Sequence, residues 1–157
     1  MKNIFYYNTK IGRIGIEENG TAITKLNFIN KEVQEEIIEE HETALLKEAI
    51  KQLNEYFDGK RKSFDLPLEP KGTEFQNKVW SALKEIPFGE TRSYGEIAKV
   101  IGNEKAARAI GMANNKNPIA IIVPCHRVIG ANGKLVGYAG GLDIKERLLK
   151  LEKNHEK

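Results

Sequence analysis

Two prolines and a glycine in the segment FDLPLEPKG, residues 64–72, divide the chain into two halves with different apolar patterns. Proline cannot donate the backbone hydrogen bond that the interior of a sheet requires, so this segment is predicted to be an edge strand running into a linker. A chain of 157 residues is long enough for two small domains. We therefore place a boundary here and expect one domain over residues 1–70 and a second over residues 71–157.

The first half has the pattern of a small sheet followed by one helix. Ile14 and Ile16, and later Leu26 and Phe28, alternate with polar or small residues, which is typical of strands with one buried face. The Asn19-Gly20 pair predicts a tight hairpin turn between them, in which both residues have positive φ. Residues 31–42 are too highly charged to be assigned. A helix is then predicted from Thr43 to a stop at Gly59, with one apolar face: Leu46, Ile50, Leu53 and Phe57.

The second half begins with two helices whose starts are marked by capping boxes. Thr73 with Gln76, and Ser93 with Glu96, have the spacing at which two side chains satisfy free backbone N–H groups at a helix start. A break at residues 87–89 separates the helices, and Gly102 ends the second one. The apolar side of the first helix is predicted to hold Phe75, Val79, Ala82, Leu83 and Ile86, and that of the second Ile97, Val100 and Ile101.

A third helix, KAARAIGMANN, follows after a turn of about three residues, so the pair is a candidate helix-turn-helix. Arg108 stands out on it among small residues, which are Ala106, Ala107, Ala109, Gly111 and Ala113. Small residues permit close packing on another helix, or close approach to a nucleic-acid groove. Residues 72–157 contain 14 Lys and Arg against 9 Asp and Glu, and this basic balance favours an anionic partner.

Cys125 is the only cysteine of the chain and stands beside a histidine in VPCHRVIG. Residues 119–123 before it are apolar and β-branched, which predicts a buried strand, and Pro124 then opens a short helix or turn. A cysteine in such a first turn lies at the positive end of a helix dipole, which favours the thiolate. A lone cysteine is more often a small buried apolar residue, so both interpretations stay open. Because adjacent side chains diverge, Cys125 would reach His126 through a water molecule.

The last helix, GGLDIKERLLKLEKN, is predicted to bury Ile144, Leu148 and Leu151. Glu152 lies four residues after Leu148, at the edge of this face. It could supply the carboxylate that a catalytic His126 needs. A glutamate at the rim, with its head group in water, is the simpler interpretation of the pattern, because a buried carboxylate is costly unless it is paired.

Other classes of protein are disfavoured by what the chain lacks. One cysteine permits no internal disulfide and no multi-cysteine zinc site, and His41, His126 and His155 show no metal-ligand spacing. The longest apolar run is five residues, far short of a membrane helix, and the N-terminus has no signal-peptide core. We expect a cytoplasmic protein with no cofactor, no metal and no membrane partner.

The motifs NPIAIIVPCHRVIG and GYAGGLDIKERLLKLE closely resemble the O6-alkylguanine-DNA alkyltransferases, and the resemblance extends over residues 73–152. It implies an α/β (α+β) fold, with a small RNase H-like αβ domain over residues 1–70. The expected second domain is mostly helical, winged-helix-like, and carries the helix-turn-helix for DNA binding and alkyl transfer. The implied activity is irreversible, single-turnover transfer of the alkyl group of O6-alkylguanine in duplex DNA to Cys125 by a monomer. O4-alkylthymine is a second candidate substrate.

The resemblance also implies a role for each matching residue. Cys125 resembles the nucleophile, His126 the base that acts through water, and Glu152 its orienting carboxylate. Asn117 resembles the residue that holds the cysteine turn, and Tyr94 the one that donates toward the guanine ring. Arg108 resembles the finger that fills the space of a base flipped through the minor groove. The predicted DNA-contacting residues are Arg108, Tyr94, Ala106, Ala107, Ala109, Gly111 and Arg127. The predicted pocket residues are Val128, Tyr138, Ala139 and Gly140.

The chain departs from some relatives of this family at two points, and three other functions remain open. Some relatives have a serine where this chain has Ala139, which puts reaction with bulky or free-base substrates in doubt. Some bind zinc in the first domain, which a chain without cysteine before Cys125 should not do. The rivals are an alkyltransferase-like protein that only binds DNA, a cysteine hydrolase and a helix-turn-helix regulator.

Overall fold

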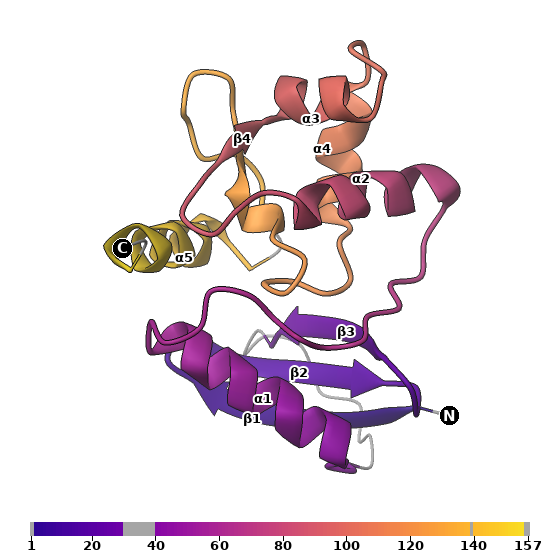
Figure 1. Ribbon diagram of the computed structural model, residues 1–157, viewed down its shortest axis with the longest axis vertical. Helices are drawn as coiled ribbons and strands as arrows, with labels where there is room; N and C mark the ends of the chain where they lie inside the picture. Colours follow the sequence, from indigo (N-terminus) through magenta and orange to yellow (C-terminus); the bar gives the residue numbers. More distant parts are fainter. Residues whose placement is uncertain (1, 30–39, 139, 156–157) are drawn as a thin grey trace. The chain divides into compact units, whose positions relative to one another are not determined.

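The computed structural model describes residues 2–29, 40–138 and 140–155, and it divides into two compact units, Met1–Pro70 and Lys71–Lys157 (Figure 1). The mixed α+β class predicted from the sequence is confirmed, with a sheet-containing first unit and a mostly helical second one. Residues 31–39, which are most of the charged segment that could not be assigned, lie outside the described residues. Among the described residues, no helix is long and apolar enough to cross a membrane.

In its described residues, 2–29 and 40–70, the first unit is a three-stranded antiparallel sheet with one helix packed on it. The strands are β1 (Asn3–Thr9), β2 (Gly12–Glu18) and β3 (Ile23–Phe28), in the order β1-β2-β3. Helix α1 (Ala44–Phe57) is capped by Thr43 and contacts β1 and β2. The core between them contains Ile4, Ile14, Ile16, Leu26, Leu46 and Leu53.

The predicted hairpin is present, but its turn differs from the predicted one. Four residues, 19–22, connect β2 and β3, and of the Asn19-Gly20 pair only Gly20 has a positive φ, at 98°. The side-chain oxygen of Asn19 accepts hydrogen bonds from the backbone N–H groups of Thr21 and Ala22, which closes the longer turn. The predicted edge strand is reduced to one parallel bridge between Leu68 and Ile23.

The second unit is built from four helices, a short 3-10 helix and two very short strands. The helices are α2 (Glu74–Lys84), α3 (Tyr94–Val100), α4 (Ala107–Asn115) and α5 (Leu142–Asn154). Both capping boxes are confirmed at the starts of α2 and α3. Helices α2, α3 and α4 pack on one another, and the indole N–H of Trp80 donates to the carbonyl of Ala113 at 2.9 Å.

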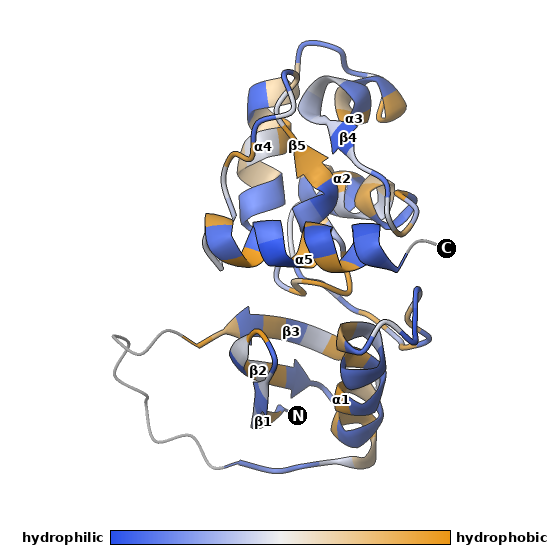
Figure 2. Cartoon of the chain, turned by 90° about the vertical axis from the view of Figure 1, so that its left-hand side faces the viewer, coloured by the Kyte–Doolittle hydropathy of each residue, from blue (hydrophilic) through white to orange (hydrophobic). Residues whose placement is uncertain are grey.

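Helices α3 and α4 contact each other as the predicted helix-turn-helix requires, but six residues, 101–106, connect them instead of about three. The apolar side of α3 also differs, because Val100 is 68% exposed while Ile97 and Ala98 are buried. Figure 2 shows α5 with polar and apolar residues interleaved along its length, as expected of a helix with one buried face.

The predicted strand over residues 119–123 is wrong. These residues are buried, but they form a tight turn in which Val123 N–H donates to Ile119 and Ile122 N–H donates to Ala120. Ile121 adopts a φ of 72°, a strained conformation for a β-branched residue. The chain then enters the 3-10 helix η1 (Cys125–Arg127) and strand β5 (Val128–Ile129), which pairs in parallel with β4 (Arg92–Ser93).

Candidate active site

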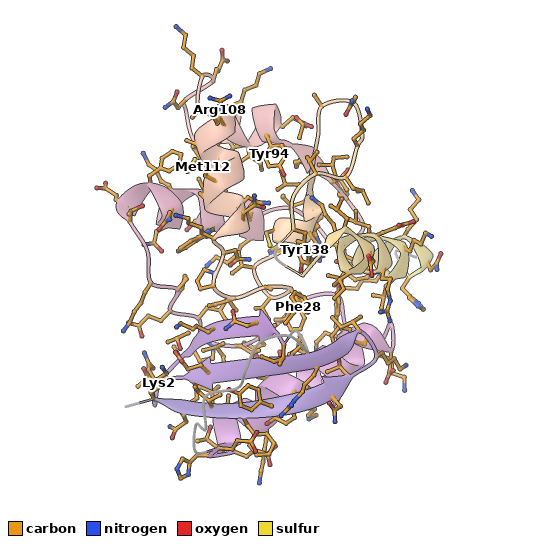
Figure 3. All side chains as sticks on the ribbon, turned by 180° about the vertical axis from the view of Figure 1, so that it is seen from behind. Lys2, Phe28, Tyr94, Arg108, Met112 and Tyr138 are labelled. Atoms are coloured by element: carbon orange, nitrogen blue, oxygen red, sulfur yellow. The ribbon has the colours of Figure 1, made fainter. Side chains whose placement is uncertain are left out.

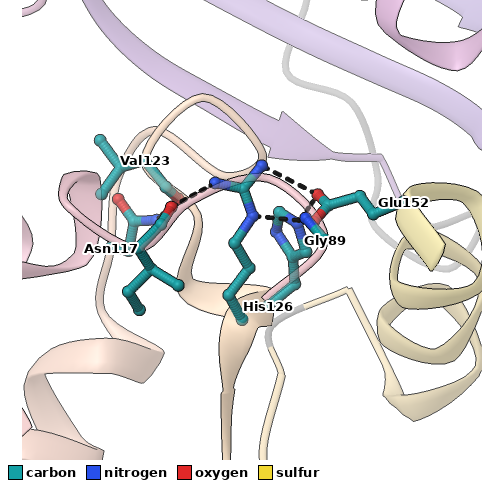
Figure 4. Close-up of polar contacts among 7 residues, drawn as sticks. Gly89, Asn117, Val123, His126 and Glu152 are labelled. Carbon is teal, nitrogen blue, oxygen red and sulfur yellow. Dashed lines mark hydrogen bonds and ion pairs between the residues drawn. The ribbon is translucent and has the colours of Figure 1, made fainter. Parts of the chain in front are cut away.

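Cys125 is 4% exposed and begins the 3-10 helix η1, which confirms the short helix predicted after Pro124. The turn before it is fixed by the side chain of Asn117 (Figure 4). Its amide nitrogen donates to the carbonyl of Val123 at 2.8 Å, and its oxygen accepts from the N–H of Ile119 at 3.0 Å. Asn117 thus bridges the two ends of the strained turn, and this fixes where the backbone enters Cys125.

Burial raises the pKa of the Cys125 thiol to about 11, and it outweighs the side chain of Asn117 and the charge of Lys145, which act in the opposite direction. The expected lowering by a helix dipole is therefore wrong, because a helix of three residues has little dipole and the thiol is desolvated. The resting thiol is protonated at neutral pH. Any reaction at this sulfur needs a base that accepts its proton.

His126 and Glu152 supply a candidate base and its partner. The distance between His126 Nε2 and Glu152 Oε2 is 2.6 Å, and both side chains are buried. Burial lowers the pKa of His126, so we assign a neutral imidazole that donates from Nε2 to the carboxylate. The other nitrogen, Nδ1, is buried and has no hydrogen-bond partner among the described residues, which leaves its lone pair able to accept a proton.

Besides His126, the Arg127 guanidinium and a backbone N–H group hold the carboxylate of Glu152. Its oxygens accept from Arg127 Nε at 2.8 Å, from Arg127 Nη2 at 3.0 Å and from the backbone N–H of Gly89 at 3.1 Å (Figure 4). Burial alone would raise the pKa of Glu152, but His126 and Arg127 together lower it to about 2. Glu152 is therefore an ionised, fully paired group, and the interpretation as a rim glutamate is wrong.

Arg127 is not placed to contact DNA, as the resemblance had suggested. It is buried, and its guanidinium donates to Glu152 and, from Nη1, to the carbonyl of Ile86 at 2.7 Å. A guanidinium committed to these acceptors stabilises the Glu152 charge instead of binding a phosphate. The expectation is corrected: Arg127 belongs to the buried network of the site.

Lys145 is a residue of the site that sequence reasoning missed. It is completely buried, and its ammonium donates to the carbonyl of Val128 at 2.6 Å and to that of Val136 at 2.9 Å. It therefore ties α5 to the strand after the cysteine and to the loop before α5. The spacing of Lys145, Leu148 and Glu152 is that of one helical face, and this signal was available in the sequence.

Asn114 is a second missed residue, and it links α4 to the cysteine. Its side chain is buried, and its amide nitrogen donates to the backbone carbonyl of Cys125 at 3.3 Å. Asn114 and Asn117 together fix both the backbone of Cys125 and the turn that precedes it. No sequence pattern indicates this contact, because an asparagine inside a helix is usually exposed.

Tyr94, at the start of α3, lies close to both Cys125 and the loop before α5. Burial raises the pKa of its phenol, and negative charge on Cys125 raises it further. The hydroxyl donates to the carbonyl of Val136 at 3.1 Å, the same oxygen that accepts from Lys145. Tyr94 also lies against α4, since a Cβ placed on Gly111 would be 3.8 Å from its ring.

The helix α4 presents most of its predicted DNA-contacting residues on its surface. Arg108, Ala107 and Ala109 are exposed and Gly111 is partly exposed. Figure 3 shows Arg108 near the N-terminal end of α4. Ala106 is the exception: it is buried and precedes the first residue of α4, so its assignment to the surface is corrected. Of the predicted pocket residues, Val128 is buried, Tyr138 and Gly140 are partly exposed, and Ala139 lies outside the described residues.

Both halves of the chain match one protein family. Residues 4–70 match the ribonuclease-like domain of 6-O-methylguanine DNA methyltransferase, and residues 74–154 match its DNA binding domain. The methylated-DNA–protein-cysteine methyltransferase of Methanosarcina acetivorans is 59% identical over 150 residues, which cover 93% of this chain and 95% of the relative.

Solved structures agree with this match. The crystal structure of Mycobacterium tuberculosis O6-methylguanine methyltransferase is 46% identical with a TM-score of 0.90, over 99% of this chain and 94% of that one. The M. tuberculosis OGT structure in complex with DNA is 48% identical with a TM-score of 0.89, over 98% and 94%. The chain, with its single cysteine beside a buried histidine and glutamate, belongs to the 6-O-methylguanine DNA methyltransferase family.

Proposed function

We propose that this protein repairs O6-alkylguanine in duplex DNA by transferring the alkyl group to the sulfur of Cys125. The observation that carries the proposal is a buried thiol whose next residue, His126, is hydrogen-bonded to buried Glu152. A protonated thiol in a desolvated site needs a base, and an imidazole that bears positive charge in such a site needs an ionised partner. His126 and Glu152 meet these two requirements.

The proposed reaction begins with proton transfer from Cys125 through a water molecule to Nδ1 of His126. The sulfur then attacks the alkyl carbon, a carbon–sulfur bond forms, and the bond between that carbon and O6 of guanine breaks with its electron pair going to the base. Tyr94, whose hydroxyl donates to the carbonyl of Val136, is proposed to donate to the guanine as this charge develops. The guanine anion takes up one proton and the imidazolium of His126 gives one up, so the step leaves neutral guanine and neutral His126.

The proposed product explains why each molecule acts once. The sulfur of Cys125 ends as a thioether, which water does not cleave under ordinary conditions, and the guanine is left unmodified. No second thiol exists in the chain to remove the alkyl group. Guanine and S-alkylcysteine are therefore both end products of the single turnover.

The proposed DNA contact uses α4 and requires the target base to leave the helix. The O6 edge inside a stacked duplex cannot reach a buried sulfur, so the nucleotide must be flipped. The small residues Ala107, Ala109 and Gly111 permit close approach to the minor groove, and Arg108 is proposed to fill the space that the base leaves. O4-alkylthymine, with its alkylated oxygen on the same edge of the ring, is proposed as a second substrate.

One chain is proposed to be sufficient for the reaction, inside the cell and as a monomer. Cys125, His126, Glu152 and Asn117 all come from the same chain, and each is positioned by contacts within it. A second copy would add no catalytic group. Because the proposed substrate is chromosomal DNA, the protein is proposed to act inside the cell.

The test is to mix the protein with duplex DNA that contains O6-methylguanine labelled in the methyl group. We expect one labelled methyl per chain, mapped by peptide mass analysis to Cys125, and no further turnover. A cysteine hydrolase would turn over repeatedly, and a protein that only binds DNA would acquire no label. Label on another residue, or more than one methyl per chain, would contradict the proposal.

A further inference from the structure

Met112 is a large apolar side chain that α4 holds in solvent. It is 59% exposed, while the buried positions of this helix are Ile110, Ala113 and Asn114. It follows Arg108 by four residues, which places both side chains on the same face of the helix. Figure 3 shows Arg108 and Met112 on α4, with Tyr94 nearby. The fold therefore leaves most of Met112 in solvent, on the face that carries Arg108.

Met112 is much larger than its neighbours on the surface of α4. The flanking surface positions Ala109 and Gly111 have little or no side chain. A helix with such residues can approach a narrow groove closely, but a long side chain in their midst prevents that approach unless it enters the groove itself. Met112 is apolar and uncharged, so it gains nothing from the phosphates at the groove edges. Its favourable place is among the bases.

We propose that Met112 is a second wedge, which enters the minor groove beside Arg108 and partly unstacks a neighbouring base step. This inference rests on the proposed function. Proteins that bind the minor groove insert apolar side chains, methionine included, between base steps. Residues four apart on a helix are separated by about 6 Å along its axis, which is roughly two base-pair steps. Met112 thus acts about two steps from the site that Arg108 fills.

The flexible thioether suits such a role. Methionine has three rotatable side-chain bonds and adapts to irregular apolar surroundings. Bases next to a damaged guanine differ from one site in the genome to another. A wedge that adapts its shape would support opening of the duplex in many sequence contexts, whereas Arg108 provides the charged contact.

The experiment uses Met112→Ala, Met112→Leu and a matched control, Val100→Ala, which truncates another exposed apolar side chain, on α3. Dissociation constants for an O6-methylguanine duplex are measured by fluorescence anisotropy at several salt concentrations. A 2-aminopurine placed two steps from the lesion reports unstacking. Thermal unfolding of each variant checks that the exposed substitutions leave the fold unchanged.

We expect Met112→Ala to weaken duplex binding about tenfold and to reduce the 2-aminopurine signal. The dependence of affinity on salt should stay the same, because no charge is removed. Met112→Leu and Val100→Ala should remain within about twofold of the unchanged protein.

An affinity and 2-aminopurine signal for Met112→Ala equal to those of the unchanged protein would overturn the wedge. Equal losses in Met112→Ala and Val100→Ala would also overturn it, since the effect would then follow from any exposed apolar group. Failure of the proposed function has a different signature. In that case the unchanged protein itself acquires no alkyl group on Cys125, whatever Met112 does to binding.

Discussion

The Nε2 atom of His126 lies 2.6 Å from Oε2 of Glu152, although the two residues are 26 positions apart in the chain and both are buried. Glu152 also accepts two hydrogen bonds from Arg127, the residue that follows His126. Two successive residues of the 3-10 helix thus share one carboxylate of α5. Arg127 keeps that carboxylate ionised, and the ionised carboxylate is what can stabilise a positive charge on His126.

The first prediction concerns the charge of Glu152. Glu152→Gln keeps the shape of the side chain but removes the group that stabilises a protonated His126, so alkyl transfer should slow by about tenfold or more. The thiol should also become harder to ionise. The measurement is the rate at which a small alkylating reagent modifies Cys125 as a function of pH. The rise of this rate with pH should occur at higher pH in the variant.

Glu146→Gln is the matched control for this variant, because Glu146 is on the same helix but exposed, and it forms an ion pair with Lys150. It should leave transfer and the pH profile unchanged. If the profiles of Glu152→Gln and the unchanged protein superimpose, His126 does not depend on this carboxylate. Binding to undamaged duplex should be similar in all three proteins, since Glu152 is buried away from solvent.

The second prediction is a loss of stability in acid. The folded-state pKa of Glu152 is about 2, below its ordinary value of 4.5, so its charge stabilises the fold above pH 4.5 and this contribution disappears as the pH falls toward 2. The shift corresponds to about 3 kcal/mol. The lowered pKa of buried His126 adds a loss that begins below its ordinary value of 6.5.

Urea unfolding at pH 7, 5 and 3 measures this dependence. The unchanged protein should lose stability steeply between pH 5 and 3, whereas Glu152→Gln, already less stable at pH 7, should lose less over that interval. Parallel curves for the two proteins would show that the acid sensitivity comes from other groups.

The contrast between Glu152 and the capping boxes shows how far the sequence could predict this molecule. Thr73 and Ser93 were assigned correctly because a capping box depends on residues three apart. The partners of Glu152 come from residues 89, 126 and 127, and no local pattern indicates that they converge. The resemblance to a known family supplied the pairing with His126, but it placed Arg127 on the DNA surface.

Residues 119–123 show a second limit of the local pattern. Five successive apolar residues predict a strand by composition, yet the chain turns within them. The turn is held by the side chain of Asn117, which bonds to the backbone at both of its ends, and it puts Ile121 at positive φ. The cost of that strained backbone is offset by contacts that the sequence does not reveal, and strain of this kind is concentrated at functional sites.

The third prediction separates the role of Arg108 from that of the fold. Arg108→Ala should strongly slow repair of a duplex, because unstacking a base costs a few kcal/mol and the proposed finger no longer holds the flipped state open. Reaction with a single-stranded oligonucleotide should slow much less. The dependence of duplex affinity on salt should also decrease, because one positive charge is removed from the DNA-bound surface. Equal losses on the two substrates would contradict the proposed finger.

The last prediction concerns Lys145, whose ammonium is buried and bonded to the carbonyls of Val128 and Val136. Lys145→Met keeps much of the length of the side chain but removes the positive charge and these hydrogen bonds, together with a longer one to the carbonyl of Gly137. The unfolding free energy should fall by about 2 kcal/mol or more, because the carbonyl of buried Val128 loses its lysine donor and an apolar group replaces the ammonium. The pKa of Cys125 should rise further, since the charge of Lys145 is one of the influences that lower it.

Two measurements distinguish these effects of Lys145. Urea unfolding gives the loss of stability, and the pH dependence of Cys125 alkylation gives the shift of the thiol. Lys150→Met, an exposed position on the same helix, is the matched control and should change neither. If the variant loses stability but the pH dependence of Cys125 alkylation does not shift, Lys145 only holds the loop before α5 and does not influence the thiol. The salt dependence of duplex binding should be unchanged in Lys145→Met, because a lysine without access to solvent cannot neutralise a phosphate.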